Sequence, residues 1–111
     1  MLGNMSRIIS PSVLSADFLH LGRDTEMLNR SEAEWIHIDV MDGVFVPNLS
    51  FGFPVLSAIR KVTTKVLDTH LMIVEPERYI ERFAKAGADI ITIHIEATED
   101  LPAAIRMIKA C

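Results

Sequence analysis

The sequence is poor in the features that would cross-link a chain or anchor it to a membrane. It has a single cysteine, Cys111, so no disulfide can form within the chain, and a reducing cytoplasmic setting fits this usage. No apolar run approaches the roughly 20 residues that a membrane helix needs. The start of the chain, Met1–Met5, lacks the charged and apolar regions of a signal peptide. We therefore expect a cytoplasmic protein that does not associate with membranes.

Positive charge is also scarce. The chain has 11 Lys and Arg residues against 15 Asp and Glu residues, with a formal net charge of −4 and no basic run, which argues against nucleic acid as a partner. Half of the residues are apolar, so a packed core is expected and disorder is not. A length of 111 residues allows about one domain.

One stretch, Trp35–Asn48, combines a strand pattern with side chains that carry chemistry. Side chains alternate between the two faces of a strand. One face carries His37, Asp39 and Met41, and the other carries Ile36, Ile38 and Val40. The apolar row predicts a helix packed against it. A buried strand does not need an imidazole beside a carboxylate, so the polar row indicates a functional site.

Strand and helix patterns alternate along the chain. The expected strands are residues 7–14, a strand from Trp35, residues 65–72 and residues 89–96. The expected helices run from Ser15 or Asp17 to about Arg30, from Pro54 to about Lys61, from Glu75 to Ala86 and from about Asp100 to Ala110. Strands that alternate with helices predict right-handed parallel crossovers and an α/β fold.

The positions of the polar residues indicate which α/β fold this is. Each expected strand has polar side chains in one row, and near the strand ends these include Ser12, Asp39, His70 and His94. Convergence of strand-end residues on one point is typical of a (β/α)₈ TIM barrel, whereas an open sheet gathers its site at one switch point. Four βα units cannot close a barrel of about 250 residues. We therefore expect residues 1–111 to be the N-terminal half of a single (β/α)₈ barrel domain, a half-barrel that either continues in a longer chain or pairs with a second copy.

Three of these side chains form a set of metal-ligand types. His37, Asp39 and His70 offer two imidazoles and a carboxylate, which suit Zn²⁺, Fe²⁺, Mn²⁺ or Co²⁺ without discriminating among them. Neighbouring strands lie about 4.8 Å apart, so the three groups can reach one ion. A lone inward histidine is more often a hydrogen-bonded core residue, so the prediction depends on the three together. A fourth ligand is not evident, although His94 and Glu96 are candidates.

Other residues of these types have simpler interpretations. We expect Asp68 to be a structural partner beneath the site and Asp42 to hold a turn. We expect His20 to be a solvated surface residue. Met41 and Met72 are by default core residues that fill gaps.

Four stretches resemble the ribulose-phosphate 3-epimerase family. They are Ser10–Phe18, Ile36–Asn48, Leu67–Met72 and Phe83–Ala97, in the order in which the family has them. The resemblance extends from about Ile8 to the last expected helix. It implies a phosphate-binding (β/α)₈ barrel of the pentose phosphate pathway and covers only the first half of the family's usual length.

The resemblance also implies roles for individual residues. His37, Asp39 and His70 would bind one divalent metal ion, and Asp39 would also be the acid/base on one face of the substrate. Substrate contacts would come from Ser12, His37, Met41, His70 and Met72. The family's second acid/base is an aspartate of a later strand, which has no counterpart here. The phosphate-binding loops likewise belong to the later strands.

The activity implied is the interconversion of D-ribulose 5-phosphate and D-xylulose 5-phosphate. Two bases would exchange protons at C3 through a cis-enediolate, which a divalent cation stabilises. The alternatives are an allulose-6-phosphate 3-epimerase and an inactive truncated half-barrel. Because the second aspartate is not in this sequence, we expect the complete protein to be an isomerase and these 111 residues alone to be inactive. We also expect a homo-oligomer.

Overall fold

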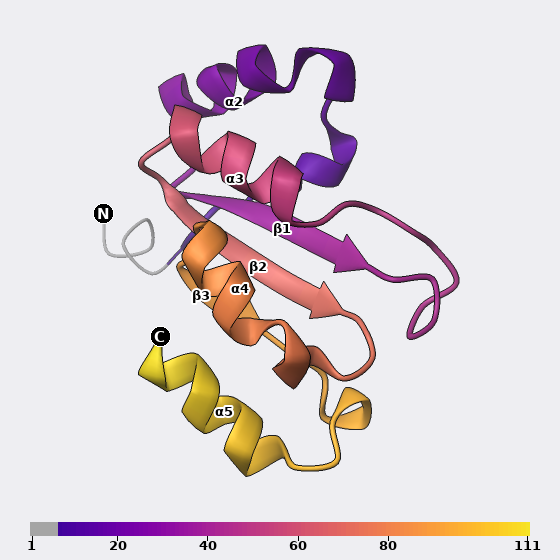
Figure 1. Cartoon of the computed structure of the whole chain (residues 1–111). Coiled ribbons are helices and arrows are strands. Elements are labelled where there is room, and N and C mark those ends of the chain that lie inside the picture. Colours follow the sequence, from indigo (N-terminus) through magenta and orange to yellow (C-terminus); the bar gives the residue numbers. More distant parts are fainter. Residues whose placement is uncertain (1–6) are drawn as a thin grey trace.

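Three parallel strands form a sheet with helices packed on one of its faces (Figure 1). The structure is a computed structural model that describes residues 7–111; the expectation about a signal peptide concerns residues outside this range. The strands, in spatial order, are β1 (Trp35–Met41), β2 (Val66–Met72) and β3 (Ile90–Thr92). The helices are α2 (Leu21–Arg30), α3 (Phe53–Val62), α4 (Ile80–Ala86) and α5 (Leu101–Ala110). Parallel strands alternating with helices agree with the prediction of part of a barrel.

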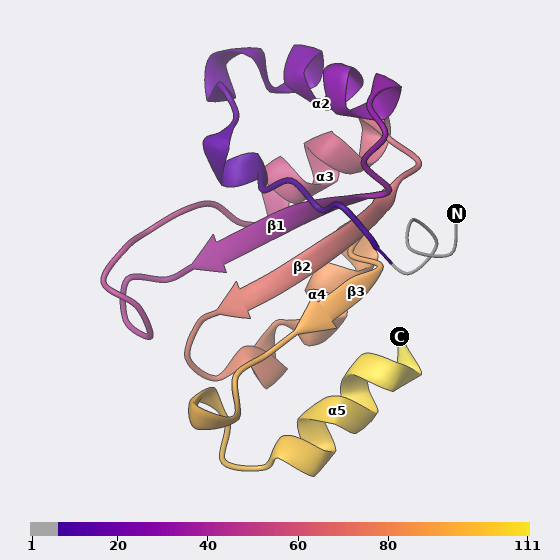
Figure 2. The ribbon, with the colours of Figure 1, turned by 180° about the vertical axis from the view of Figure 1, so that it is seen from behind.

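The two long strands alternate strictly between buried and half-buried residues. The buried row contains Ile36 and Ile38 of β1 with Leu67 and Leu71 of β2, all without solvent exposure. It joins one core cluster with residues of α3 and α4, among them Leu56 and Phe83. Burying one such aliphatic side chain contributes about 1.5–3 kcal/mol. The half-buried row lies on the opposite face, which Figure 2 shows with the strands in front of α3 and α4.

The pairing register of β1 and β2 aligns their polar rows. His37 is opposite Asp68, Asp39 is opposite His70, and Met41 is opposite Met72. Parallel strands end at the same edge of a sheet, so this register brings the predicted site residues to one edge. The apolar rows determine it, because a slip by one residue would turn each row to the other face.

The prediction of a first strand over residues 7–14 is mostly wrong. Residues 7–12 run beside β1, with Trp35 N donating to Ile9 O at 3.3 Å and His37 N donating to Pro11 O at 2.8 Å. The only ladder pairing described for this segment is a single bridge between Ser12 and His37. The chain then turns through a 3-10 helix, η1 (Val13–Ser15). Pro11 has no N–H to donate to a ladder, and the Ser12 side chain caps η1 by accepting from Leu14 N.

The last expected strand and the third expected helix are shorter than predicted. β3 ends at Thr92, and a 3-10 helix, η4 (Ile95–Ala97), follows in place of the strand expected to residue 96. The third helix is divided into a 3-10 turn, η3 (Pro76–Arg78), and α4. Glu75, which precedes Pro76, has a left-handed backbone with φ of 47°. A residue before proline is disfavoured in the helical region, which explains why the turn begins only at Pro76. The interruption itself is at Tyr79, whose φ of −126° and ψ of −8° are not helical.

Several helices begin or end close to the predicted residues. The Asp17 carboxylate caps a 3-10 turn, η2 (Phe18–His20), that leads into α2. Asp100 caps α5 by accepting from Ala103 N. α4 ends at Gly87, whose φ is 129° and where an added Cβ would lie 2.5 Å from the Arg60 side chain. A residue with a side chain at position 87 would therefore be strained and would collide with Arg60.

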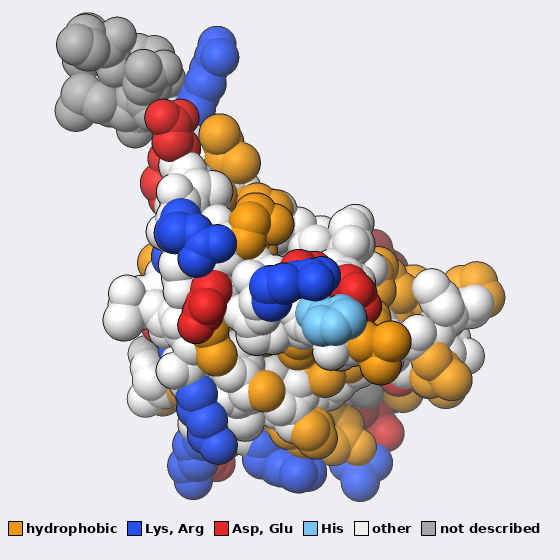
Figure 3. All heavy atoms as spheres, turned by 90° about the horizontal axis from the view of Figure 1, so that it is seen from above, with side chains coloured by type: hydrophobic (Ala, Val, Ile, Leu, Met, Phe, Trp, Pro, Cys, Tyr) orange, Lys and Arg blue, Asp and Glu red, His pale blue; other side chains and the backbone are white. Residues whose placement is uncertain are grey.

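The face seen from above in Figure 1 carries charged side chains of both signs among apolar ones (Figure 3). Near the start of α2, Arg23 Nη2 lies 3.5 Å from Asp17 Oδ2, and Arg23 Nε lies 3.3 Å from Asp24 Oδ1. His20 is exposed, as expected, with Nδ1 2.9 Å from the Asp17 carboxylate. Among residues 7–111, no helix has the length and apolar character needed to cross a membrane.

Candidate active site

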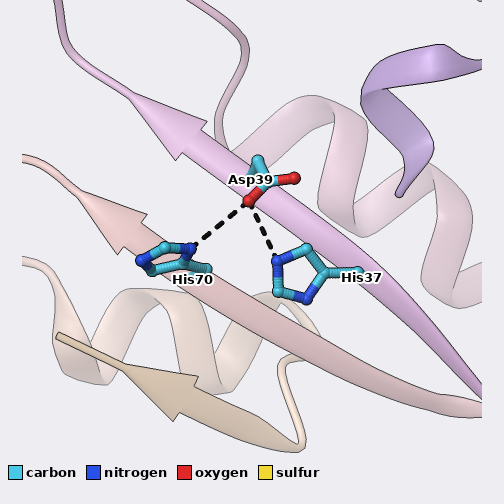
Figure 4. Close-up of side chains that lie close together, drawn as sticks. All are labelled: His37, Asp39 and His70. Atoms are coloured by element: carbon cyan, nitrogen blue, oxygen red, sulfur yellow. Dashed lines mark hydrogen bonds and ion pairs between the residues drawn. The ribbon is translucent and has the colours of Figure 1, made fainter. Parts of the chain in front are cut away.

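The candidate site lies towards the carboxyl ends of β1 and β2, on the sheet face opposite α3 and α4. The side chains of His37 and Asp39 project from β1, and His70 projects from β2 towards them (Figure 4). Residues two apart on a strand share a face, and the register places His70 beside Asp39. The side chains that the sequence predicts as metal ligands therefore lie together.

Asp39 is at the centre of this group. Its Oδ1 atom is 2.9 Å from His37 Nε2 and 3.4 Å from His70 Nδ1. Its Oδ2 atom accepts a hydrogen bond from the Ser12 hydroxyl at 2.7 Å. The carboxylate thus turns one oxygen to the two imidazoles and the other to Ser12.

The geometry of the three groups fits a metal ion. One donor atom from each of His37, Asp39 and His70 can be chosen so that all lie within 4.8 Å of one another. His37 also has the support that metal-binding histidines usually have, because its other nitrogen, Nδ1, is 2.9 Å from Asp68 Oδ2. A donor set of two nitrogens and one oxygen suits Zn²⁺, Fe²⁺, Mn²⁺ or Co²⁺.

The environment of His70 favours its neutral form. Burial lowers the pKa of this imidazole from 6.5, and the charge of His94 lowers it further, while Asp39 has an opposing effect that does not outweigh them. Metal ligation requires an unprotonated ring nitrogen. The lowered pKa keeps His70 in that form at neutral pH.

The other predicted site residues lie around the Asp39 carboxylate or at the ends of the strands. Met41 and Met72 are half-buried register partners at the last positions of β1 and β2. The expectation of a structural partner beneath the site agrees with the contact of Asp68 to His37. The two candidates for a fourth ligand, His94 and Glu96, do not belong to the cluster that the three donors form.

Two contacts at the site edge have no clear signal in the sequence. Ser50 Oγ donates to Asp39 O at 2.7 Å and accepts from Met41 N at 2.9 Å. It thereby ties the loop after β1 to the end of that strand. The Phe45 ring lies 5.1 Å from that of His94. A serine and a phenylalanine in a loop are too common to predict such contacts.

Asp42 holds the rim of the site, which extends its expected role in a turn. Its Oδ1 accepts from Val44 N and Phe45 N at 2.9 and 2.8 Å. Its Oδ2 accepts from Val74 N at 2.8 Å, so the loop after β1 is joined to the loop after β2. Partial desolvation raises the pKa of Asp42, but these backbone N–H groups together hold it below the ordinary 3.8.

We predict that Asp42→Asn lowers the free energy of unfolding by about 1–2 kcal/mol at neutral pH, because the amide nitrogen cannot accept from Val74 N. Because the pKa of Asp42 is lower in the folded chain than in the unfolded one, Asp42 stabilises the fold fully at any pH above the pKa of the unfolded chain, near 4. This stabilisation is lost as the pH falls through the folded pKa. In urea unfolding across this pH range, the free energy of unfolding should therefore fall less with decreasing pH in Asp42→Asn than in the parent. The exposed Glu81→Gln is the control, and equal pH dependence in Asp42→Asn and the parent would contradict the prediction.

Comparison with known proteins places this geometry in a family. Residues 8–111 match the model of the ribulose-phosphate 3 epimerase family. The chain is 57% identical to a ribulose-phosphate 3-epimerase of Synechocystis over 89 residues, which are 80% of this chain and 39% of that protein. It is 52% identical to the one of Bacillus subtilis over 101 residues, 91% of this chain and 46% of that protein. The chloroplastic ribulose-5-phosphate-3-epimerase of Arabidopsis thaliana is 49% identical over 105 residues, 93% of this chain and 37% of that protein.

The chain spans less than half the length of these curated relatives. Members of the family fold as TIM barrels, and the parallel sheet with alternating helices agrees with part of one. The family match covers the strands, the helices and the cluster around Asp39. On this evidence the chain belongs to the ribulose-phosphate 3-epimerase family.

Proposed function

We propose that the complete protein is a ribulose-phosphate 3-epimerase that interconverts D-ribulose 5-phosphate and D-xylulose 5-phosphate. In this proposal, residues 1–111 are the N-terminal half of a single (β/α)₈ domain. The observation that carries it is a carboxylate, Asp39, whose Oδ1 faces two imidazoles at 2.9 and 3.4 Å. It is supported by relatives of that name at up to 57% identity. A cytoplasmic location and a homo-oligomeric state stay predictions.

The same proposal assigns the metal ligands to His37, Asp39 and His70. Asp68 would orient His37 by accepting the proton of Nδ1, which leaves Nε2 free to bind the ion. The ion, one of Zn²⁺, Fe²⁺, Mn²⁺ or Co²⁺, would act as a Lewis acid that stabilises negative charge on the substrate oxygens. The donor set supports a divalent ion without selecting among these metals.

Asp39 is the proposed proton carrier on one face of the substrate. Inverting a carbon next to a ketone requires that one base remove its proton and that an acid return a proton from the opposite side. Oδ1 of Asp39 faces the imidazoles, so Oδ2 is the atom that would exchange the proton. The Ser12 hydroxyl orients Oδ2 by donating a hydrogen bond to it at 2.7 Å. We assign the opposite face to a second carboxylate outside residues 1–111.

The remaining substrate contacts are assigned to the half-buried residues around this carboxylate. Ser12 would contact the substrate from the extended segment beside β1. The thioethers of Met41 and Met72, which are paired in the register, would form an aprotic wall beside the reacting carbon. A thioether has no acidic proton that could quench a carbanion, and it is polarizable.

The direct test is an assay of the complete purified protein. We expect it to convert ribulose 5-phosphate to xylulose 5-phosphate, to lose activity after chelation and to regain it with divalent cations. In D₂O, deuterium should appear at C3, because the returned proton comes from solvent-exchanged groups. A higher rate with allulose 6-phosphate would favour the hexose phosphate alternative. Activity that survives complete chelation would contradict the metal assignment.

A further inference from the structure

His70 has a contact on the nitrogen that faces away from Asp39, and the metal assignment leaves this contact unexplained. Its Nε2 lies 2.7 Å from Nε2 of His94. The ring centroids are 4.9 Å apart and the ring planes are inclined by 29°, so the two rings meet edge to edge through these nitrogens. Both side chains are half-buried. Two lone pairs would repel at this distance, so one of the two nitrogens carries a proton and donates it to the other.

The direction of this hydrogen bond follows from the position of the Asp39 carboxylate. His70 Nδ1 is 3.4 Å from Asp39 Oδ1 and is therefore the nitrogen aimed at the metal position. A ligand nitrogen needs its lone pair, so a neutral His70 that is ready to bind the ion would hold its proton on Nε2. His70 Nε2 is then the donor and His94 Nε2 the acceptor.

We propose that His94 is a positioning residue for metal binding, which selects the tautomer and orientation of His70 by accepting the hydrogen bond from its Nε2. This inference rests on the metal site of the proposed function. Each of the two imidazole ligands would then have a hydrogen-bond partner for the ring nitrogen that does not bind the ion. Asp68 accepts from Nδ1 of His37, and His94 accepts from Nε2 of His70. Partners of this kind fix the ring and raise its basicity.

The surroundings of His94 hold it in the accepting orientation. His94 follows β3 in an extended conformation, two residues beyond Thr92, which pairs with His70. The Phe45 ring packs against it at 5.1 Å. If His94 accepts through Nε2, its own proton is on Nδ1, and that atom is 3.8 Å from Glu96 Oε2.

The test compares His94→Phe with His94→Gln in the complete protein. Phenylalanine keeps a ring against Phe45 and His70 but cannot accept a hydrogen bond, whereas the glutamine amide oxygen can. We expect His94→Phe to weaken Zn²⁺ binding about 10–100-fold in competition with a chelator, and His94→Gln to recover most of the loss. The control is His20→Phe, which replaces an exposed histidine away from the site and should bind Zn²⁺ as the parent does.

A second measurement reads the tautomer without metal or substrate. Nitrogen-15 NMR of the metal-free protein, above the titration range of histidine, should show His70 protonated on Nε2 in the parent and in His94→Gln. In His94→Phe we expect a mixture of tautomers. Unchanged Zn²⁺ affinity in His94→Phe would overturn the inference, and so would a weaker affinity with an unchanged His70 tautomer.

These outcomes are separate from those of the proposed function. If the protein binds Zn²⁺ as described but does not turn over ribulose 5-phosphate, the substrate assignment fails and the role of His94 stands. If the parent is an active epimerase and His94→Phe binds Zn²⁺ normally, the role of His94 fails and the activity stands.

Discussion

Asp39→Asn in the complete protein is expected to lower kcat for ribulose 5-phosphate by about 10³-fold or more, even at saturating metal. The amide cannot accept a proton, and general acid–base catalysis by a positioned side chain is worth about 10²–10⁴-fold. Asparagine keeps the size of the side chain and one oxygen to accept from Ser12, so the fold should change little. The measurement is kcat as a function of metal concentration.

Asp68→Asn is the matched control for this prediction. It changes a neighbouring carboxylate that projects from β2 on the same face of the sheet and contacts His37 at 2.9 Å. Asp68 is not proposed to transfer a proton. We expect it to weaken metal binding about 10–100-fold and to regain most of its kcat when metal is saturating. If Asp39→Asn were rescued by metal in the same way, Asp39 would be a ligand only, and the proton carrier would be elsewhere.

The 111-residue chain by itself is expected to turn over ribulose 5-phosphate about 10⁴-fold more slowly than the complete protein. Among residues 7–111, the carboxylates nearest the imidazoles, Asp39 and Asp68, project from neighbouring strands on the same sheet face. They would therefore approach a substrate from one side. Epimerisation by two bases needs a second group on the opposite side, so only half of the exchange can take place.

The assay of the short chain needs evidence that it is folded and binds metal. Circular dichroism and Co²⁺ binding provide this, because the donors His37, Asp39 and His70 are all within the described residues. A folded, metal-bound chain without turnover is the expected result. Turnover by the short chain near that of the complete protein would contradict the two-base mechanism and the assignment of the second carboxylate to other residues.

Much of the site was predictable because it depends on short-range geometry. The period of two along a strand puts His37, Asp39 and Met41 on one face whatever the rest of the fold does. The ends of two helices, at Arg30 and Ala86, are likewise local, and the structure has both. Local backbone sterics and hydrogen bonds decide such features, and they are readable in a few consecutive residues.

The contacts that were not predicted depend on distant parts of the chain. The contact of His94 with His70 requires β3 to pair with β2 in one register and then to end at Thr92. The link from Asp42 to Val74 requires two loops to meet at the same edge of the sheet. No short sequence pattern predicts these two contacts, because they depend on how the helices pack against the opposite face of the sheet.

The first expected strand shows how strand propensity can mislead. Residues 7–14 have the alternation of a strand, yet only Ser12 forms a ladder bridge. Pro11 lacks a donor, and Ser12 uses its hydroxyl for Leu14 N and for Asp39. Competing hydrogen bonds of the Ser12 side chain, one of them donated to a residue 27 positions away, decide the outcome.

The sequence by itself determined the alternation of strands and helices, the polar face of β1 and the identity of the three candidate ligands. Periodicity and residue chemistry are properties of the chain alone. Only the tertiary structure decided that Asp39 Oδ1 faces both imidazoles, that Oδ2 accepts from Ser12 and that His94 meets the far nitrogen of His70. These depend on strand register and side-chain orientation, which the packing of the whole sheet against its helices selects.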